Sequence, residues 1–248
     1  MRLLKPFILI QLRPEDKASD SEYNVFLKVT GLDKQDLVRF RGEKVSFKDL
    51  DLSKYSGVFV GGSPFDVTTP EEKKTDVQKR VEEDFSYLIP KIIKEDFPFL
   101  GACSGNGLLS LFANGVMSKK YGEPVGGVDI YLTEEGKKDK LLSGFPDKFR
   151  AMVGHKEACE VPPPSAKVLA YSKTCPIQMM RIGEKVYSTQ FHPEADAQEI
   201  MLRIDIYRNY GYFPPEAAEE LKAQVAKEKV YWPQKILQGF VEIYGKKA

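Results

Sequence analysis

The sequence predicts an α/β fold with a doubly wound, mostly parallel central sheet, helices on both faces, an antiparallel extension and a helical C-terminal tail. Over the first 113 residues, short apolar runs alternate with helical patterns, which is typical of parallel βαβ units. After residue 125, short apolar runs are separated mainly by turns, which favours antiparallel strands. The chain has 248 residues and 42% hydrophobic content, so it can bury one full core.

The parallel part of the predicted sheet comes from four apolar runs. The predicted strands are residues 7–12, 37–40, 57–60 and 97–100. A helix capped by Asp20 or Ser21 and ended by Gly31 follows the first strand. An amphipathic helix over residues 69–94 leads into the fourth strand, and Pro90 is expected to end or kink it.

The turn after the fourth strand carries a G-x-C-x-G sequence, from Gly101 through Cys103 to Gly105. A strand that runs directly into a helix through such a turn is typical of a nucleophile elbow, here with cysteine as the nucleophile. The helix N-terminus is expected to lower the pKa of the Cys103 thiol below the free value of about 8.5. The alternative is that Cys103 is a small buried hydrophobic residue and that the glycines serve only helix packing.

The antiparallel part ends at a second polar motif, Phe191-His192-Pro193-Glu194. The predicted strands are residues 125–132, 149–153, 167–171, 177–181 and 185–190, of which the last two form a hairpin. Because residues two apart in an extended segment point to the same side, Glu194 can orient the His192 ring. The second ring nitrogen is then free to face Cys103 as a base.

Together, the two motifs resemble those of the class I (triad) glutamine amidotransferases, whose signatures are G-x-C-x-G-x-Q and a late F-H-P-E. The resemblance runs from about Phe7 to about Glu194. The chain looks most like the free-standing members of the family that are similar to the amidotransferase domain of GMP synthase. It implies a flavodoxin-like amidotransferase fold. It also implies that Cys103, His192 and Glu194 form a catalytic triad.

The resemblance also implies further site residues. It places two oxyanion-hole donors at the backbone N–H groups of Gly62 and Ser104, and it places Gly61 and His155 at the substrate pocket. Without it, Gly61-Gly62 indicates only a turn after a strand, and His155 only a structural hydrogen-bonding residue. Gly107 stands where the family has glutamine, so it either opens space for a larger γ-glutamyl compound or has no functional meaning.

The composition narrows the classes of partner. Lys and Arg total 37 against 36 Asp and Glu, so no basic excess favours binding to nucleic acid or to anionic membranes. No run approaches eighteen apolar residues, and Lys5 and Pro6 interrupt the N-terminal apolar run, which we interpret as part of a strand. Three cysteines form neither a disulfide framework nor a zinc pattern, which predicts a reducing, cytoplasmic location and neither metal nor cofactor.

The sequence therefore predicts an amidotransferase-like catalytic domain over residues 1–194 and a helical extension over residues 195–248 that packs on it. The tail helices are expected at residues 200–207, 216–229 and 233–244. The predicted activity is hydrolysis of the glutamine side-chain amide, or a related γ-glutamyl amide, through a thioester on Cys103. The released ammonia could pass to a separate synthase subunit. The alternatives are a γ-glutamyl peptidase or hydrolase with larger substrates, and a non-catalytic regulatory module.

Overall fold

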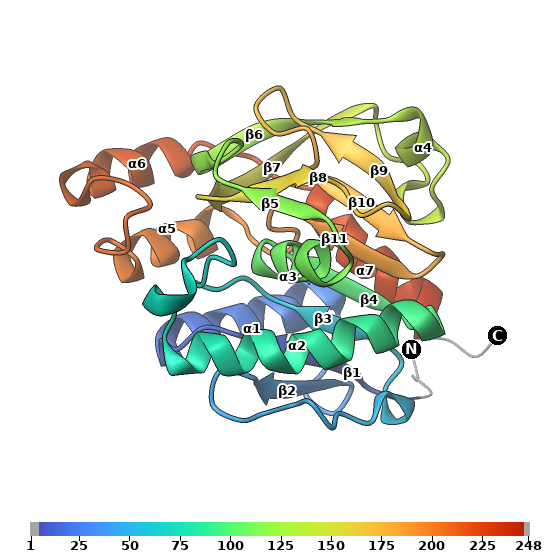
Figure 1. The fold of residues 1–248 in the computed structure, drawn as a ribbon. Coiled ribbons are helices and arrows are strands. Elements are labelled where there is room, and N and C mark those ends of the chain that lie inside the picture. Colours follow the sequence, from blue (N-terminus) through green and yellow to red (C-terminus); the bar gives the residue numbers. More distant parts are fainter. Residues whose placement is uncertain (1–4, 246–248) are drawn as a thin grey trace.

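A nine-stranded mixed sheet runs through the protein, with helices on both faces (Figure 1). The computed structural model describes residues 5–245. The strand order is β2-β1-β3-β4-β11-β10-β9-β6-β7, parallel from β2 to β11 and antiparallel from β11 to β7. The strands are β1 (Phe7–Gln11), β2 (Leu37–Arg41), β3 (Val58–Val60), β4 (Phe99–Ala102), β6 (Glu123–Leu132), β7 (Lys148–His155), β9 (Ala166–Tyr171), β10 (Met179–Ile182) and β11 (Val186–Thr189). The predicted doubly wound sheet with an antiparallel extension is confirmed.

Most of the helices lie in the parallel part or in the C-terminal tail, and one short helix follows β6 in the antiparallel part. They are α1 (Asp16–Thr30), α2 (Asp76–Glu95), α3 (Ser104–Phe112), α4 (Glu134–Lys137), α5 (Ala197–Ile206), α6 (Ala218–Val225) and α7 (Trp232–Tyr244). A small second sheet pairs β5 (Val116–Ser118) with β8 (Ala158–Val161). The sequence did not predict this pair, because strands of three and four residues are too short to show a clear alternation.

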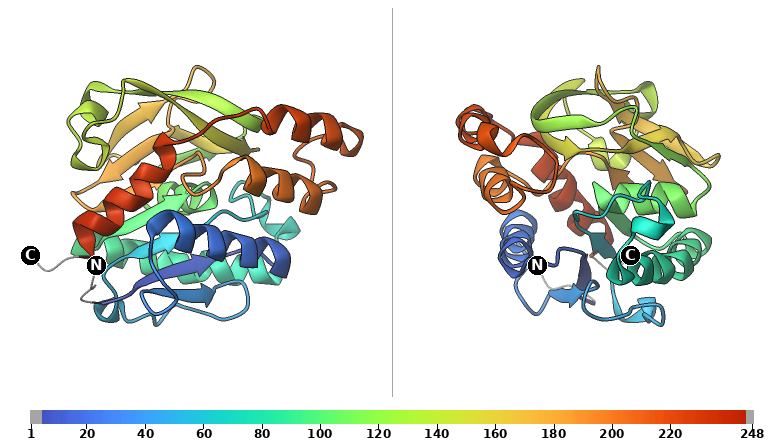
Figure 2. Two further views of the ribbon diagram at one scale, coloured as in Figure 1. Left: turned by 180° about the vertical axis from the view of Figure 1, so that it is seen from behind. Right: turned by 60° about the vertical axis from the view of Figure 1, so that its left-hand side comes forward.

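The alternation of side chains along β1 explains why both faces of the sheet carry helices. Phe7 and Leu9 belong to a core that includes residues of α1 and α7, whereas Ile8 and Ile10 belong to a core that includes residues of α2 and α3. All four side chains are fully buried. The view from behind in Figure 2 brings α1 and α7 to the front, on the face opposite α2.

In the C-terminal tail, helix α7 supplies the buried side chains of the core that contains Phe7 and Leu9. Its Phe240 is buried and packs against the rings of Phe59 and Phe7, with centroid distances of 5.2 and 6.1 Å. Tyr187 on β11 meets the same ring edge-on at 6.3 Å. The division into residues 1–194 and 195–248 stays a prediction, and its outer ends, residues 1–4 and 246–248, lie outside the described residues.

Several predicted helix limits are wrong. Helix α1 begins at Asp16 rather than after Asp20 or Ser21, because Asp20 lies inside the helix and pairs with Arg39. Its predicted end is confirmed, since Gly31 adopts the left-handed conformation with φ 70°. Helix α6 is shorter than the predicted 216–229.

Helix α2 also differs from its predicted limits. It begins at Asp76, where Thr75 accepts a hydrogen bond from Gln78 N, so residues 69–75 lie outside it. The helix continues through Pro90 to Glu95. Buried Ile89 and Ile92 on either side of Pro90 pack into the core, and this packing outweighs the missing N–H of the proline.

The described residues include no helix that is long and apolar enough to cross a lipid bilayer. The cytoplasmic location inferred from the cysteine content stays a prediction.

Replacing Phe240 by alanine is expected to lower the free energy of unfolding by about 3–5 kcal/mol, because it removes a buried ring from the centre of an aromatic cluster. Urea unfolding followed by circular dichroism measures this loss. The matched control is Ile243→Ala on the same helix, whose side chain is 38% exposed. It should cost less than about 1 kcal/mol. Equal losses for the two variants would contradict the placement of α7.

Candidate active site

Cys103 occupies a strained turn between β4 and α3. Its φ and ψ are 53° and −98°, values that non-glycine residues rarely adopt. The turn is tight, since a Cβ at Gly101 would lie 2.7 Å from the backbone carbonyl carbon of Gly105. The two glycines of the motif therefore allow the close approach of strand and helix, and Cys103 stands at the N-cap position of α3.

His192 follows β11, the strand beside β4. Its backbone N–H donates to the carbonyl oxygen of Met152 over 2.9 Å, which fixes the residue against β7. The His192 Nδ1 atom lies 2.9 Å from Glu194 Oε1, and both side chains are buried. Although burial opposes ionisation, the neighbouring His192 and Arg203 hold the pKa of Glu194 well below its usual range. Glu194 is therefore a buried carboxylate.

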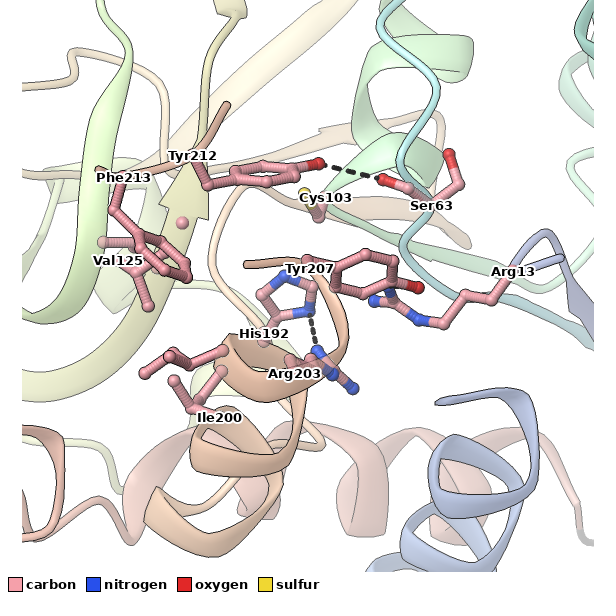
Figure 3. Close-up of a pocket in the computed structure, with 13 residues that line it drawn as sticks. Arg13, Ser63, Cys103, Val125, His192, Ile200, Arg203, Tyr207, Tyr212 and Phe213 are labelled. Carbon is pink, nitrogen blue, oxygen red and sulfur yellow. Dashed lines mark hydrogen bonds between the residues drawn. The ribbon is translucent and has the colours of Figure 1, made fainter. Parts of the chain in front are cut away.

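Cys103 and His192 line the same cavity, which has a volume of about 40 Å³. In Figure 3, Tyr212 lies beside the Cys103 sulfur and Arg203 lies beside the His192 ring. Within residues 5–245, no hydrogen bond joins the sulfur to the ring. Such contacts often form only when substrate binds. The remaining walls are largely apolar and aromatic: Val125, Val153, Ile200, Ile204, Tyr207 and Phe213.

The predicted low pKa of Cys103 is wrong. Burial raises the pKa of this thiol to about 12, and the positive charges of Arg13 and Arg203 offset the effect only in part. Burial also lowers the pKa of His192, against the opposing attraction of Glu194. The helix N-terminus is visible in the sequence, whereas the loss of water around the sulfur follows only from the fold. The resting site therefore pairs a neutral thiol with a neutral imidazole.

The loop that carries Gly62 is tied to Ser104, the first residue of α3, beside the thiol. The Ser63 N–H donates to Ser104 Oγ over 2.8 Å, and the two serine hydroxyl oxygens lie 2.8 Å apart. A Cβ at Gly62 would stand 2.9 Å from His192 Cε1 and 2.6 Å from Arg13 Nη2. Ser104 is the first residue of α3, so its N–H has no acceptor within the helix. Only glycine lets the backbone at residue 62 approach the imidazole this closely.

The other predicted pocket residues do not line this cavity. His155 is buried, and its ring nitrogens contact Glu123 Oε2 at 2.8 Å and the Glu157 carbonyl oxygen at 2.9 Å. A Cβ at Gly61 would meet the Glu22 carboxylate at 2.5 Å, so Gly61 makes room for Glu22.

Gly107 does not open a space. A Cβ there would contact side chains of Met117, Glu157 and Val67 at 3.4–3.8 Å, so the neighbouring volume is already occupied. The Glu157 carboxylate accepts hydrogen bonds from the backbone N–H groups of Val67 and Thr68. This finding argues against the interpretation that Gly107 admits a larger substrate.

Two arginines of the cavity, Arg13 and Arg203, belong to neither sequence motif and were not predicted. Arg13 follows β1 and is bound by Glu22 at 2.9 Å and by the hydroxyl oxygen of Tyr207 at 3.1 Å. Arg203 lies on α5 and contacts both His192 and Glu194. The position of Arg13 directly after a parallel strand is a signal that could have been used, because ligands bind at that edge of such sheets. No local pattern marks Arg203.

No group of three or more His, Cys, Asp or Glu side chains within residues 5–245 is arranged to hold a metal ion.

Known proteins are similar to this chain over part of its length. A protein from Pyrococcus abyssi, described as one of the subunits of GMP synthase [glutamine-hydrolyzing], is 37% identical over 115 residues, which are 46% of this chain and 58% of that protein. GMP synthase [glutamine-hydrolyzing] from Borreliella burgdorferi is 29% identical over 152 residues, 61% of this chain and 27% of the relative. This chain thus spans little more than half of the length of the first relative and about a quarter of the length of the second.

The fold is shared with solved structures. A glutamine amidotransferase from Thermotoga maritima matches with a TM-score of 0.74 at 21% identity, covering 98% of this chain and 99% of that one. The family model described as "Glutamine amidotransferase class-I" matches residues 22–204, which include the Cys103 turn, the His192 motif and most of α5. The chain belongs to the class I glutamine amidotransferase family.

Proposed function

We propose that this protein hydrolyses the side-chain amide of glutamine through a covalent thioester on Cys103. The observation that carries the proposal is that Cys103 and His192 line one cavity while the Glu194 carboxylate lies 2.9 Å from His192 Nδ1. A nucleophile, a base and an orienting carboxylate are the three groups that acyl transfer requires. Family membership and the names of the relatives support glutamine as the substrate.

In the proposed first half-reaction, His192 Nε2 takes the proton of the Cys103 thiol as the sulfur attacks the amide carbon. The carbonyl oxygen becomes an oxyanion that accepts hydrogen bonds from the backbone N–H groups of Gly62 and Ser104. When the tetrahedral intermediate collapses, the C–N bond breaks and the imidazolium gives its proton to the departing ammonia. A γ-glutamyl thioester remains on Cys103.

In the second half-reaction, His192 removes a proton from a water molecule that attacks the thioester carbon. The C–S bond then breaks, the imidazolium returns the proton to the sulfur, and glutamate leaves. Glu194 stays ionised throughout and stabilises the imidazolium, as the carboxylate does in other triads. The resting neutral pair fits this sequence, because proton transfer then occurs only when a carbonyl is available for attack.

Of the two substrate classes considered, glutamine is favoured over larger γ-glutamyl compounds. The volume beside Gly107 is filled by the side chains of Met117, Glu157 and Val67, so this position leaves no room for a larger substrate. We also propose that the ammonia passes to a separate acceptor subunit, since the Pyrococcus abyssi relative is named as one subunit of a synthase. Retention of all three triad residue types argues against a purely regulatory module.

Replacing Cys103 by alanine is expected to lower glutaminase activity by about 10⁴-fold or more, because no other group replaces the nucleophile. Glutamate release from glutamine measures this loss, and circular dichroism checks the fold. Cys175→Ala is the matched control, since Cys175 is buried outside the cavity and should keep activity near the parental level. Parental turnover by Cys103→Ala would refute the assignment of the nucleophile.

Replacing Gly62 by alanine is expected to lower kcat by about 10²-fold, because the added Cβ must displace the oxyanion loop, Arg13 or the His192 ring by several tenths of an ångström or more. Gly126→Ala is the control, since a Cβ there meets nothing within 4 Å. Steady-state kinetics with glutamine gives both values. If the two variants behave alike, the close approach at Gly62 has no catalytic importance.

The pH dependence of kcat/KM follows from the shifted pKa values of His192 and Cys103. His192 must be neutral to act as a base, and burial lowers its pKa below 6.5. We therefore expect kcat/KM to be constant from about pH 7 to pH 9 and to fall only as the pH drops through this lowered pKa. With the pKa of Cys103 raised to about 12, no increase from thiolate formation is expected near pH 8–9. A rise in kcat/KM with a midpoint in that range would contradict a neutral resting pair.

A further inference from the structure

Arg203 reaches the proposed base from outside the two sequence motifs. It extends from α5, and its Nη1 atom lies 3.0 Å from His192 Nδ1. Its Nη2 atom donates to Glu194 Oε1 over 2.9 Å, and its Nε atom donates to Glu199 Oε1 over 3.2 Å. The side chain is buried and also lines the cavity at Cys103 (Figure 3).

His192 Nδ1 therefore has two partners with opposite requirements. The Glu194 carboxylate only accepts hydrogen bonds, so it needs a proton on Nδ1. The Arg203 guanidinium only donates, so it needs a lone pair on Nδ1. A neutral imidazole carries only one proton. Nδ1 can therefore donate to Glu194 or accept from Arg203, but it cannot do both at once.

This choice decides whether His192 can act as a base. With the proton on Nδ1, the Nε2 lone pair can accept the proton of the Cys103 thiol. With Arg203 donating to Nδ1, the proton lies on Nε2, and the ring cannot remove the proton of the thiol. The two tautomers are thus an active and an inactive state of the same ring.

We propose that Arg203 is a positioning residue that holds His192 in the inactive tautomer until a substrate carboxylate binds the guanidinium and releases Nδ1 to Glu194. This inference rests on the proposed function and names a substrate group for that site. An amino acid brings an α-carboxylate into a cavity lined by Arg203 and Arg13, and a guanidinium pairs strongly with a carboxylate. Binding then shifts the population toward the active tautomer, since the carboxylate favours that state.

The competing explanation is that Arg203 only neutralises the buried Glu194 and Glu199 carboxylates. A purely structural role leaves the tautomer of His192 the same with and without ligand. The chain suits a direct test because it has only two histidines, His155 and His192. His155 lies outside the cavity and serves as the internal reference in nitrogen NMR of protein labelled with ¹⁵N-histidine.

The first experiment uses Cys103→Ala protein, which retains Arg203 and does not turn over glutamine. Without ligand, we expect an unprotonated signal for His192 Nδ1 and a protonated signal for Nε2, and saturating L-glutamine should exchange them. The matched ligand is 4-aminobutanamide, which has the same amide but no α-carboxylate and should leave the signals unchanged. A protonated Nδ1 in the free protein, or equal effects of the two ligands, would overturn the proposal.

The second experiment compares Arg203→Met with Arg208→Gln in the otherwise unchanged chain. Arg208 pairs with Glu219 on the surface, outside the cavity, so its variant should retain the parental KM and kcat. Arg203→Met should show a protonated Nδ1 without ligand and a KM for glutamine raised about 10- to 100-fold, with a much smaller change in kcat. A folded Arg203→Met protein with the parental tautomer and KM would contradict the proposal.

Two further outcomes separate this inference from the proposed function. If the wild-type protein hydrolyses glutamine but the His192 signals do not exchange, the function stands and the role of Arg203 fails. If it does not hydrolyse glutamine, the function fails on its own evidence. If Arg203→Met does not fold, the ligand titration of Cys103→Ala decides the role of Arg203 alone.

Discussion

The parallel pairing of β4 with β11 is the constraint on which the site depends. The register places Ala102 opposite Thr189, and the Cys103 N–H donates to the Thr189 carbonyl oxygen over 2.8 Å. Cys103 therefore leaves the sheet one residue after this pair, and His192 leaves it three residues after. A slip of one residue would move every side chain of a strand to the other face. The packing of Tyr187 against α7 and the hydrogen bond from Ser188 to α3 therefore fix where the imidazole emerges.

Polar contacts beneath the elbow keep this register. Asn106 on α3 donates to Gln190 Oε1 over 2.9 Å and accepts from Ser188 Oγ over 2.8 Å, and all three side chains are buried. These bonds hold α3 to β11 directly behind the strained turn. Strained backbone costs of order 1–3 kcal/mol and persists only where its surroundings impose it. The Asn106 contacts thus help to maintain the conformation of Cys103.

The sequence predicts those parts of the protein that local patterns encode. The strands of the sheet alternate or are continuously apolar, and the two motifs are short, so the order of elements and the meeting of His192 with Glu194 could be anticipated. Arg203 could not, because it belongs to the site only through the way distant elements pack, whereas Arg13 carries one signal, its place after a parallel strand. The pKa of Cys103 was predicted with the wrong sign for the same reason: a helix N-terminus is visible in a sequence, whereas the burial of a sulfur is not.

The burial that raises the pKa of Cys103 comes partly from the C-terminal tail. Tyr207 and Tyr212 follow the motif of His192, yet both line the cavity at the thiol. Tyr207 is fixed by Arg13 and by Glu15, to which its hydroxyl donates over 3.0 Å, while Tyr212 reaches the Ser63 carbonyl oxygen at 3.4 Å. Removing such aromatic walls would rehydrate the sulfur and favour its thiolate. The tail therefore contributes to the raised pKa of the thiol and, through Arg203 on α5, also contacts His192, so the proposed nucleophile and the proposed base both adjoin the same segment of chain.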